Sequence, residues 1–204
     1  MAVLSKPRLA PLHREDWIKA AFARLSDLGV EAVRVEVLAR DLGVSKGSFY
    51  WHFRNRIDLL DRMLASWEDE ELHSIDPDED SSAATRWARF VQGTADPNRI
   101  RVEVAVRAWA RRDERVARAV AIVERRRSAV IANVLRDVGF ARPAAELWSQ
   151  VALLVCLGWL DRATRDREFQ LASRSLGEFL SELVLAASSR PPTSSPWTSS
   201  KYSK

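Results

Sequence analysis

Residues 43–56, GVSKGSFYWHFRNR, combine aromatic and basic side chains in a way that suits binding to phosphate groups. Tyrosine hydroxyl, indole N–H, imidazole N–H and ammonium groups all donate hydrogen bonds to phosphate oxygens. Burying the consecutive rings at 49–53 would leave their polar atoms in need of partners, and exposing all of them would favour aggregation. The stretch is therefore expected to have one face in a protein core and another toward a ligand.

A helix over residues 46–52 would separate these two faces. Phe49 and Phe53 are four residues apart, so they share the inward side of such a helix. The residues that this arrangement directs to DNA are Lys46, Gly47, Ser48, Tyr50, Trp51, His52 and Arg56. Short helical hairpins also occur in proteins that bind no DNA, and in such a protein Tyr50 and Trp51 would be interface residues.

The elements that must position this helix are predicted to form a helix-turn-helix. Apolar residues at helical spacing indicate helices over about 15–27, 35–42 and 46–52. Ala39 permits a close crossing of the second and third helices, Gly43 suits the turn between them, and Phe49 returns to the shared core. Ser45 is expected to cap the third helix.

A long fourth helix is expected from Asn55, its cap, to about residue 72. Its inward residues are predicted to be Ile57, Leu60, Leu64 and Trp67. Further helices are expected over about 83–94, 98–111, 113–138, 144–163 and 168–187. The fold class is therefore all-α, with about nine helices. Four regions are expected: a flexible arm (1–12), a helix-turn-helix domain (13–58), a ligand-binding and dimerisation domain (59–187) and a disordered tail (188–204).

The residues of the first helices resemble the N-terminal domain of TetR-type (TetR/AcrR) transcriptional regulators. The resemblance covers about residues 14–64 and is carried by Leu28-Gly29, Leu38-Ala39, Leu42-Gly43-Val44-Ser45, Lys46-Gly47-Ser48, Tyr50-Trp51-His52-Phe53 and Leu59-Leu60. It implies a homodimer that binds a palindromic operator in double-stranded DNA, without a cofactor. It also implies that a small-molecule effector, bound by the C-terminal domain, releases or changes the DNA complex.

The resemblance also assigns roles to single residues. Lys46, Gly47 and Ser48 match positions that reach bases or nearby phosphates, and residues 50–52 match positions that contact the DNA backbone. Arg56 stands where a phosphate-binding Lys is usual. Arg34 stands where the family commonly has a Thr or Ser that caps the second helix and touches phosphate. Arginine can reach a phosphate but cannot cap in the same way. Arg34 and Ser45 complete the set of predicted DNA contacts.

The C-terminal part is predicted to supply a pocket and a dimer interface. Residues that could line a pocket for an apolar or aromatic ligand are Trp67, Trp87, Phe90, Trp109 and Trp148. For any single tryptophan of this set, a core position is the favoured interpretation. The segment ELWSQVALLVCLGWL is apolar almost all round and, with the helix at 168–187, is expected to form a four-helix dimer interface. The alternative is a deeply buried monomer core. Arg107 and the ERRR run at 124–127 are expected to be solvated.

Other function classes find little support in the sequence. The net charge of +4 is only a weak indication of nucleic-acid binding. The single cysteine excludes an intramolecular disulfide framework. The first residues lack an apolar signal core, which favours a cytoplasmic protein. The run 151–160 is shorter than the roughly 20 apolar residues that a membrane span needs. The three histidines form no defensible catalytic or metal constellation, and DPDED lacks the pattern of a calcium loop. An enzyme is not expected. A helical ligand-binding or adaptor protein without specific DNA binding is the alternative function.

Overall fold

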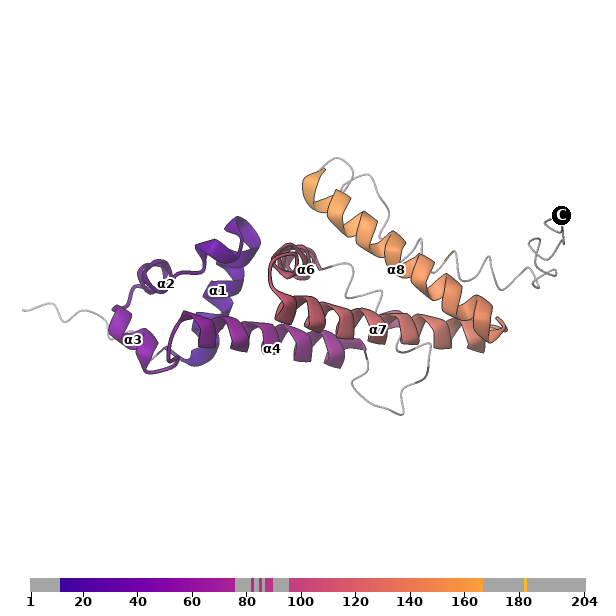
Figure 1. Ribbon diagram of the computed structural model, residues 1–204, viewed down its shortest axis with the longest axis horizontal. Helices are drawn as coiled ribbons and strands as arrows, with labels where there is room; N and C mark the ends of the chain where they lie inside the picture. Colours follow the sequence, from indigo (N-terminus) through magenta and orange to yellow (C-terminus); the bar gives the residue numbers. More distant parts are fainter. Residues whose placement is uncertain are drawn as a thin grey trace, which may run out of the picture. The chain divides into compact units, whose positions relative to one another are not determined.

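The computed structural model describes residues 12–75 and 96–166, together with residues 82, 85, 87–89 and 182 (Figure 1). Every element in these ranges is helical, which confirms the all-α prediction. The predicted arm, the helices at 83–94 and 168–187 and the tail fall mostly or wholly outside the described residues. The chain divides into two compact units, Met1–Trp67 and Glu68–Lys204.

The first unit contains the predicted helix-turn-helix. Its elements are α1 (Arg14–Leu28), the 3₁₀-helix η1 (Val30–Ala32), α2 (Val35–Asp41), α3 (Lys46–Tyr50) and the start of α4 (Arg56–Ile75). The helix α3 ends at Tyr50, earlier than predicted, with Trp51 as its C-cap residue. The long helix α4 continues past the boundary at Trp67, so its last turns belong to the second unit.

A glycine turn joins α2 to α3. Gly43 has a φ of 68°, in the left-handed region that glycine adopts without a Cβ penalty. The Val44 N–H donates to the Ala39 carbonyl at 2.9 Å, and the Gly43 N–H donates to the Arg40 carbonyl at 3.1 Å. These two bonds form a Schellman motif, which satisfies carbonyls at the end of α2 and redirects the chain into α3.

An aromatic core fixes α3 against α1. Phe49 and Phe53 are buried, as predicted, and their rings stack at 5.1 Å. Trp17 of α1 meets Phe49 edge-on at 5.3 Å, a contact that sequence reasoning missed. Edge-to-face ring pairs add to the stabilisation that burial of their apolar area provides.

One inward residue of α4 was predicted wrongly. Ile57 is 58% exposed, whereas Leu59 and Met63 are fully buried. Asn55 caps α4 as predicted, because its Oδ1 accepts a hydrogen bond from the Asp58 N–H at 3.0 Å. The helix therefore begins with Ile57 in its solvent-facing first turn, and the buried stripe starts two residues later.

The second unit is built around α7. Its described helices are α6 (Pro97–Ala110), α7 (Glu114–Asp137) and α8 (Arg142–Arg165), and α7 packs against both of the others (Figure 1). Aspartates cap two of them: Asp96 accepts from the Asn98 N–H and Asp113 from the Arg115 N–H. Between α7 and α8 lies a core cluster of Ile131, Leu135, Ala145 and Cys156. Burial raises the pKa of the Cys156 thiol to about 12.

The helix α8 is apolar on its exposed side as well as on its buried side. Ala145 and Cys156 are buried, whereas Leu147, Trp148 and Leu154 are 60%, 53% and 68% exposed. By length and composition alone α8 could cross a membrane, a test that core helices of soluble proteins also pass. The sequence prediction considered only the run 151–160 and did not count the apolar turns of α8 on either side of it.

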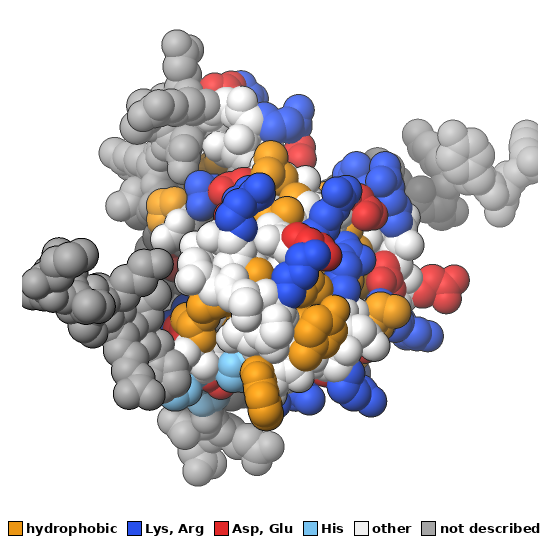
Figure 2. Space-filling model, turned by 90° about the vertical axis from the view of Figure 1, so that its left-hand side faces the viewer, with side chains coloured by type: hydrophobic (Ala, Val, Ile, Leu, Met, Phe, Trp, Pro, Cys, Tyr) orange, Lys and Arg blue, Asp and Glu red, His pale blue; other side chains and the backbone are white. Residues whose placement is uncertain are grey.

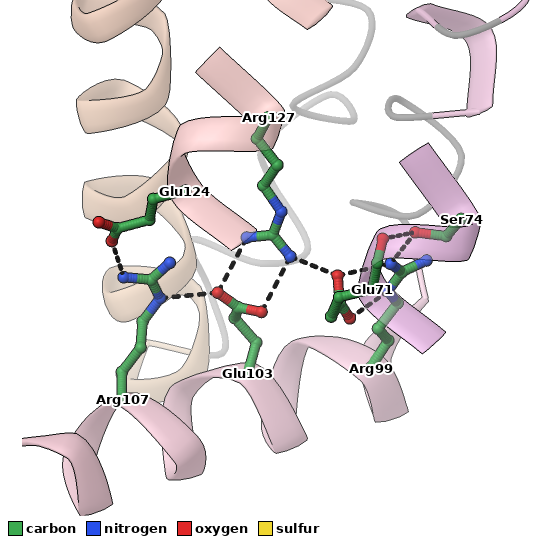
Figure 3. Close-up of polar contacts among 7 residues, drawn as sticks. All are labelled: Glu71, Ser74, Arg99, Glu103, Arg107, Glu124 and Arg127. Carbon is green, nitrogen blue, oxygen red and sulfur yellow. Dashed lines mark hydrogen bonds and ion pairs between the residues drawn. The ribbon is translucent and has the colours of Figure 1, made fainter. Parts of the chain in front are cut away.

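A buried charged cluster crosses the second unit, and it corrects two predictions (Figure 3). Arg127, expected to be solvated, is only 8% exposed and binds both Glu103 and Glu71. Arg107, also expected to be solvated, binds Glu103 and Glu124. The members of this charged cluster are Glu71, Arg99, Glu103, Arg107, Glu124 and Arg127. They come from α4, α6 and α7. The charges of these arginines are therefore compensated by glutamates on neighbouring helices rather than by water.

Candidate DNA-binding site

The outward face of α3 presents two large aromatic side chains to solvent. Tyr50, whose ring contacts the buried Phe49, is 62% exposed, and Trp51, the C-cap residue of α3, is 88% exposed. On the surface that carries α3, hydrophobic side chains lie beside Lys and Arg side chains (Figure 2). A phenol and an indole held in this way can donate to an anion or stack on a planar group.

Lys46, at the first position of α3, is held by an exposed ion pair. Its Nζ lies 2.9 Å from Oε1 of Glu36 in α2, and both side chains are 59% exposed. The hydrogen bond from Lys46 is the main reason that the pKa of Glu36 lies below its ordinary value. Solvent-exposed pairs of this kind contribute little stability, so Lys46 can exchange its partner for a phosphate at small cost.

The residues around Lys46 give α3 an open N-terminus. Ser45 occupies the predicted N-cap position, but its side chain makes no capping hydrogen bond. Its carbonyl instead accepts from the Ser48 N–H at 3.0 Å. Gly47 is exposed, and a Cβ there would meet only the Ser45 Oγ, at 3.5 Å. Ser48 and His52 are half-buried at the edge of this face.

Arg56 has partners inside the first unit. Its Nε donates to the Val33 carbonyl at 2.6 Å and its Nη2 donates to the Val30 carbonyl at 2.7 Å. The half-buried guanidinium thus joins the start of α4 to the segment before α2. Sequence reasoning gave it only a phosphate-binding role, because the carbonyls that it binds are more than twenty residues away.

Arg34 lies at the N-cap of α2 without capping it. Its backbone is extended, and its exposed side chain donates from Nε to the Glu31 carbonyl at 3.0 Å. The helix begins at Val35 even so. A cation therefore stands at the start of α2, where an anion could also bind.

A further ion pair that the sequence did not reveal ties α1 to α2. Arg24 donates from Nε and Nη2 to the two carboxylate oxygens of Asp41, both at 2.6 Å. This bidentate geometry fixes the orientation of α2 relative to α1. The hydrogen bonds from Arg24 hold the pKa of Asp41 below its ordinary value.

The predicted ligand-binding residues lie in different surroundings. Trp67 and Trp109 are buried, Trp87 packs against the core cluster that holds Cys156, and Trp148 is 53% exposed. Phe90 lies outside the described residues. A cavity of about 40 Å³ does occur in the second unit, but none of these four tryptophans lines it. Among the described residues, no group of His, Cys, Asp and Glu could hold a metal ion.

Known sequences match the first unit. Residues 18–63 match the family model described as bacterial regulatory proteins, tetR family. The class C tetracycline repressor protein of Escherichia coli is 36% identical over 85 residues, which cover 41% of this chain and 36% of that repressor. The class D repressor of Escherichia coli is 31% identical over 91 residues, or 43% of this chain and 38% of the repressor. The chain thus spans well under half the length of these relatives.

Solved structures match a larger part of the chain. A transcriptional regulator from Rhodococcus sp. Rha1 gives a TM-score of 0.68 at 20% identity, covering 86% of this chain and 95% of that one. SmeT, the repressor of the Stenotrophomonas maltophilia multidrug efflux pump SmeDEF, gives 0.63 at 18% identity, covering 86% of this chain and 90% of its own. At these identities the likeness to solved structures shows the fold alone. Over residues 18–63, the chain is similar to the bacterial regulatory proteins of the tetR family.

Proposed function

We propose that this protein is a sequence-specific DNA-binding regulator of transcription that acts as a repressor. The observation that carries the proposal is the division of the aromatic run: Phe49 and Phe53 are buried, while Tyr50 and Trp51 are exposed on α3. An exposed phenol and indole at the end of a short helix that begins with Lys46 fit contact with a DNA backbone. The names of the tetracycline repressors and of SmeT support repression rather than activation.

The assignment of roles follows exposure. Tyr50, Trp51 and His52 would contact the phosphate backbone, together with Ser45 and Arg34, whereas Lys46, Gly47 and Ser48 would lie nearest the base edges in the major groove. Arg56 would act mainly by holding α4 to the segment before α2, with its charge adding to the field that attracts DNA. In the alternative, an adaptor without DNA binding, Tyr50 and Trp51 would be protein-interface residues, and the assay below distinguishes the two functions.

The assembly and its control also belong to this proposal. A homodimer would bind a palindromic operator with two copies of α3, and the exposed apolar face of α8 would lie in the dimer interface. A small-molecule effector in the C-terminal domain would weaken the DNA complex. The protein would work in the cytoplasm, without a cofactor and without catalysing a reaction.

Selection from random double-stranded DNA, followed by fluorescence anisotropy at two salt concentrations, tests this function. A palindromic consensus with salt-dependent affinity is expected. Trp51→Ala should weaken binding to all sequences alike, and Tyr50→Phe should do so to a smaller extent, whereas Ser48→Ala should change the preferred sequence. Leu28→Ala is the matched control, because Leu28 is an apolar residue of the same unit that is 64% exposed but lies on α1. Equal affinity for all sequences, or equal loss with Leu28→Ala, would refute the proposal.

A further inference from the structure

The small cavity of the second unit has two kinds of wall. Its lining includes the apolar residues Ile75, Ile100 and Leu157. It also includes Arg89, Arg99 and Arg127, together with Glu103 and Ser74. A volume of about 40 Å³ corresponds to about three water positions. The cavity therefore has room for a small molecule with one polar end and one apolar end.

Two of these arginines are already neutralised. Arg99 binds Glu71 through Nε and Nη2 at 2.8 and 2.6 Å, and Arg127 binds Glu103 at 2.9 and 3.0 Å. In the whole charged cluster, Arg99, Arg107 and Arg127 balance Glu71, Glu103 and Glu124 (Figure 3). The carboxylates of the cluster thus have no surplus charge to offer to another cation.

Arg89 also lines the cavity, and no carboxylate of the charged cluster balances its positive charge. Its Nη1 is buried and has no hydrogen-bond partner among the residues that the structure describes. An arginine keeps its proton in proteins, so the cost of burying this donor cannot be avoided by losing the charge. A buried N–H without an acceptor destabilises the protein, and an anion placed in the cavity would remove that cost.

The shape and the charge together select a class of ligand. One surplus positive charge calls for a monoanion. The planar fork of a guanidinium matches the two oxygens of a carboxylate. The apolar wall excludes a fully hydrated inorganic ion and accepts a short hydrocarbon chain, while the volume excludes a long one.

We infer that the cavity formed by α4, α6, α7, α8 and Arg89 binds a short-chain monocarboxylate, with the carboxylate on Arg89 and the alkyl chain against Ile100 and Leu157. This inference rests on the proposed function in one respect: such a carboxylate would be the small-molecule effector of the regulator. The binding site itself does not depend on DNA.

Binding is tested on the DNA-free full-length protein with sodium propionate as the probe. Isothermal titration and thermal unfolding are compared for propionate, for neutral propionamide and for sodium chloride at equal ionic strength. Propionate should raise the melting temperature, and the other two should not. Arg89→Gln should weaken propionate binding about tenfold or more, as expected when a hydrogen bond to a charged group is lost. Arg125→Gln, which removes an exposed arginine of α7, should leave it unchanged.

Two further results separate binding from a merely structural role of Arg89. Arg89→Gln should not lower the melting temperature of the ligand-free protein, because the buried Nη1 has no hydrogen-bond partner to lose among the described residues. Leu157→Phe should fill the cavity and block propionate with Arg89 intact. Equal shifts with propionate and propionamide, or unchanged binding in Arg89→Gln, would overturn the inference.

The DNA assay distinguishes this inference from the proposed function. Propionate that binds and weakens the DNA complex supports both. Propionate that binds without changing DNA affinity supports the site but overturns its role as the effector site. A protein that binds propionate but no specific DNA overturns the proposed function and leaves the carboxylate site in place.

Discussion

Replacing Arg127 with methionine tests whether the charged cluster holds the second unit together. Methionine keeps much of the length of the side chain but removes its bonds to Glu103 and Glu71. Breaking a buried ion pair by removing one partner costs about 3–5 kcal/mol. Glu103 would retain Arg107 at 2.7 Å and Glu71 would retain Arg99 at 2.6 Å, so neither carboxylate is left alone. The expected loss is therefore near the lower limit, about 3 kcal/mol.

Urea unfolding of the full chain, followed by far-ultraviolet circular dichroism, measures this loss. Arg99→Met is the matched control, because its side chain is 22% exposed, compared with 10% for Arg127, and it contacts a single carboxylate of the cluster. Arg99→Met should therefore cost less, about 1–2 kcal/mol. A second control adds Glu103→Gln to Arg127→Met and should recover part of the stability, because an amide needs no counter-charge.

The stability that Glu103 contributes should depend on pH. Burial alone would raise the pKa of Glu103, but attraction and hydrogen bonds from Arg127, with a contribution from Arg107, bring its pKa below the ordinary value of 4.5. The stabilisation is thus complete above about pH 4.5 and is lost as the pH falls through the lower folded-state pKa. Without Arg127 the pKa of Glu103 should rise, so the cost of Arg127→Met should shrink between pH 7 and pH 4. A cost below about 1 kcal/mol, or one that does not change with pH, would refute the account.

Three further predictions concern the first unit. Gly43→Ala should lower the free energy of unfolding by about 1 kcal/mol. The loss should come from backbone strain alone, because an added Cβ meets nothing within 4 Å. Urea midpoints measure this loss, and an unchanged midpoint would contradict a left-handed φ at Gly43 in solution. Arg56→Lys keeps the charge but loses the fork that binds the Val30 and Val33 carbonyls, so stability should fall by about 2 kcal/mol while the salt dependence of DNA binding is preserved. Glu36→Gln should release Lys46 and raise DNA affinity severalfold in anisotropy titrations, and an unchanged affinity would mean that Lys46 does not reach the DNA.

The helix-turn-helix could be predicted from the sequence because its determinants are local. The spacing of Ala39, Gly43 and Phe49 decides a helix crossing, a turn and a core contact within eleven residues. The same reasoning failed for Ile57, which lies in the exposed first turn of α4 rather than on its buried stripe. Element boundaries are sensitive to the position of one hydrogen bond at a helix start, whereas the identity of a periodic helix is not.

The polar partners could not be predicted because they are distant in the sequence. Arg127 binds Glu71 across 56 residues, and Arg56 binds Val30 across 26. A run such as ERRR looks the same whether its last residue faces solvent or a buried carboxylate. The signal that could have helped is periodicity: Val116, Val120, Val123, Arg127, Val130 and Val134 lie on one buried stripe of α7, which places Arg127 inward.

The buried Cys156 makes the native protein almost unreactive toward thiol reagents. It is the single cysteine of the chain, it is 3% exposed, and burial raises its pKa to about 12. At neutral pH only ~0.001% of such a thiol is thiolate, the form that reacts with maleimides and methanethiosulfonates. A cysteine introduced at an exposed position such as Leu28 would therefore take a spin label or fluorophore alone, with Cys156 left in place. If two copies associate, that one substitution gives a pair of labels whose separation can be measured with and without DNA.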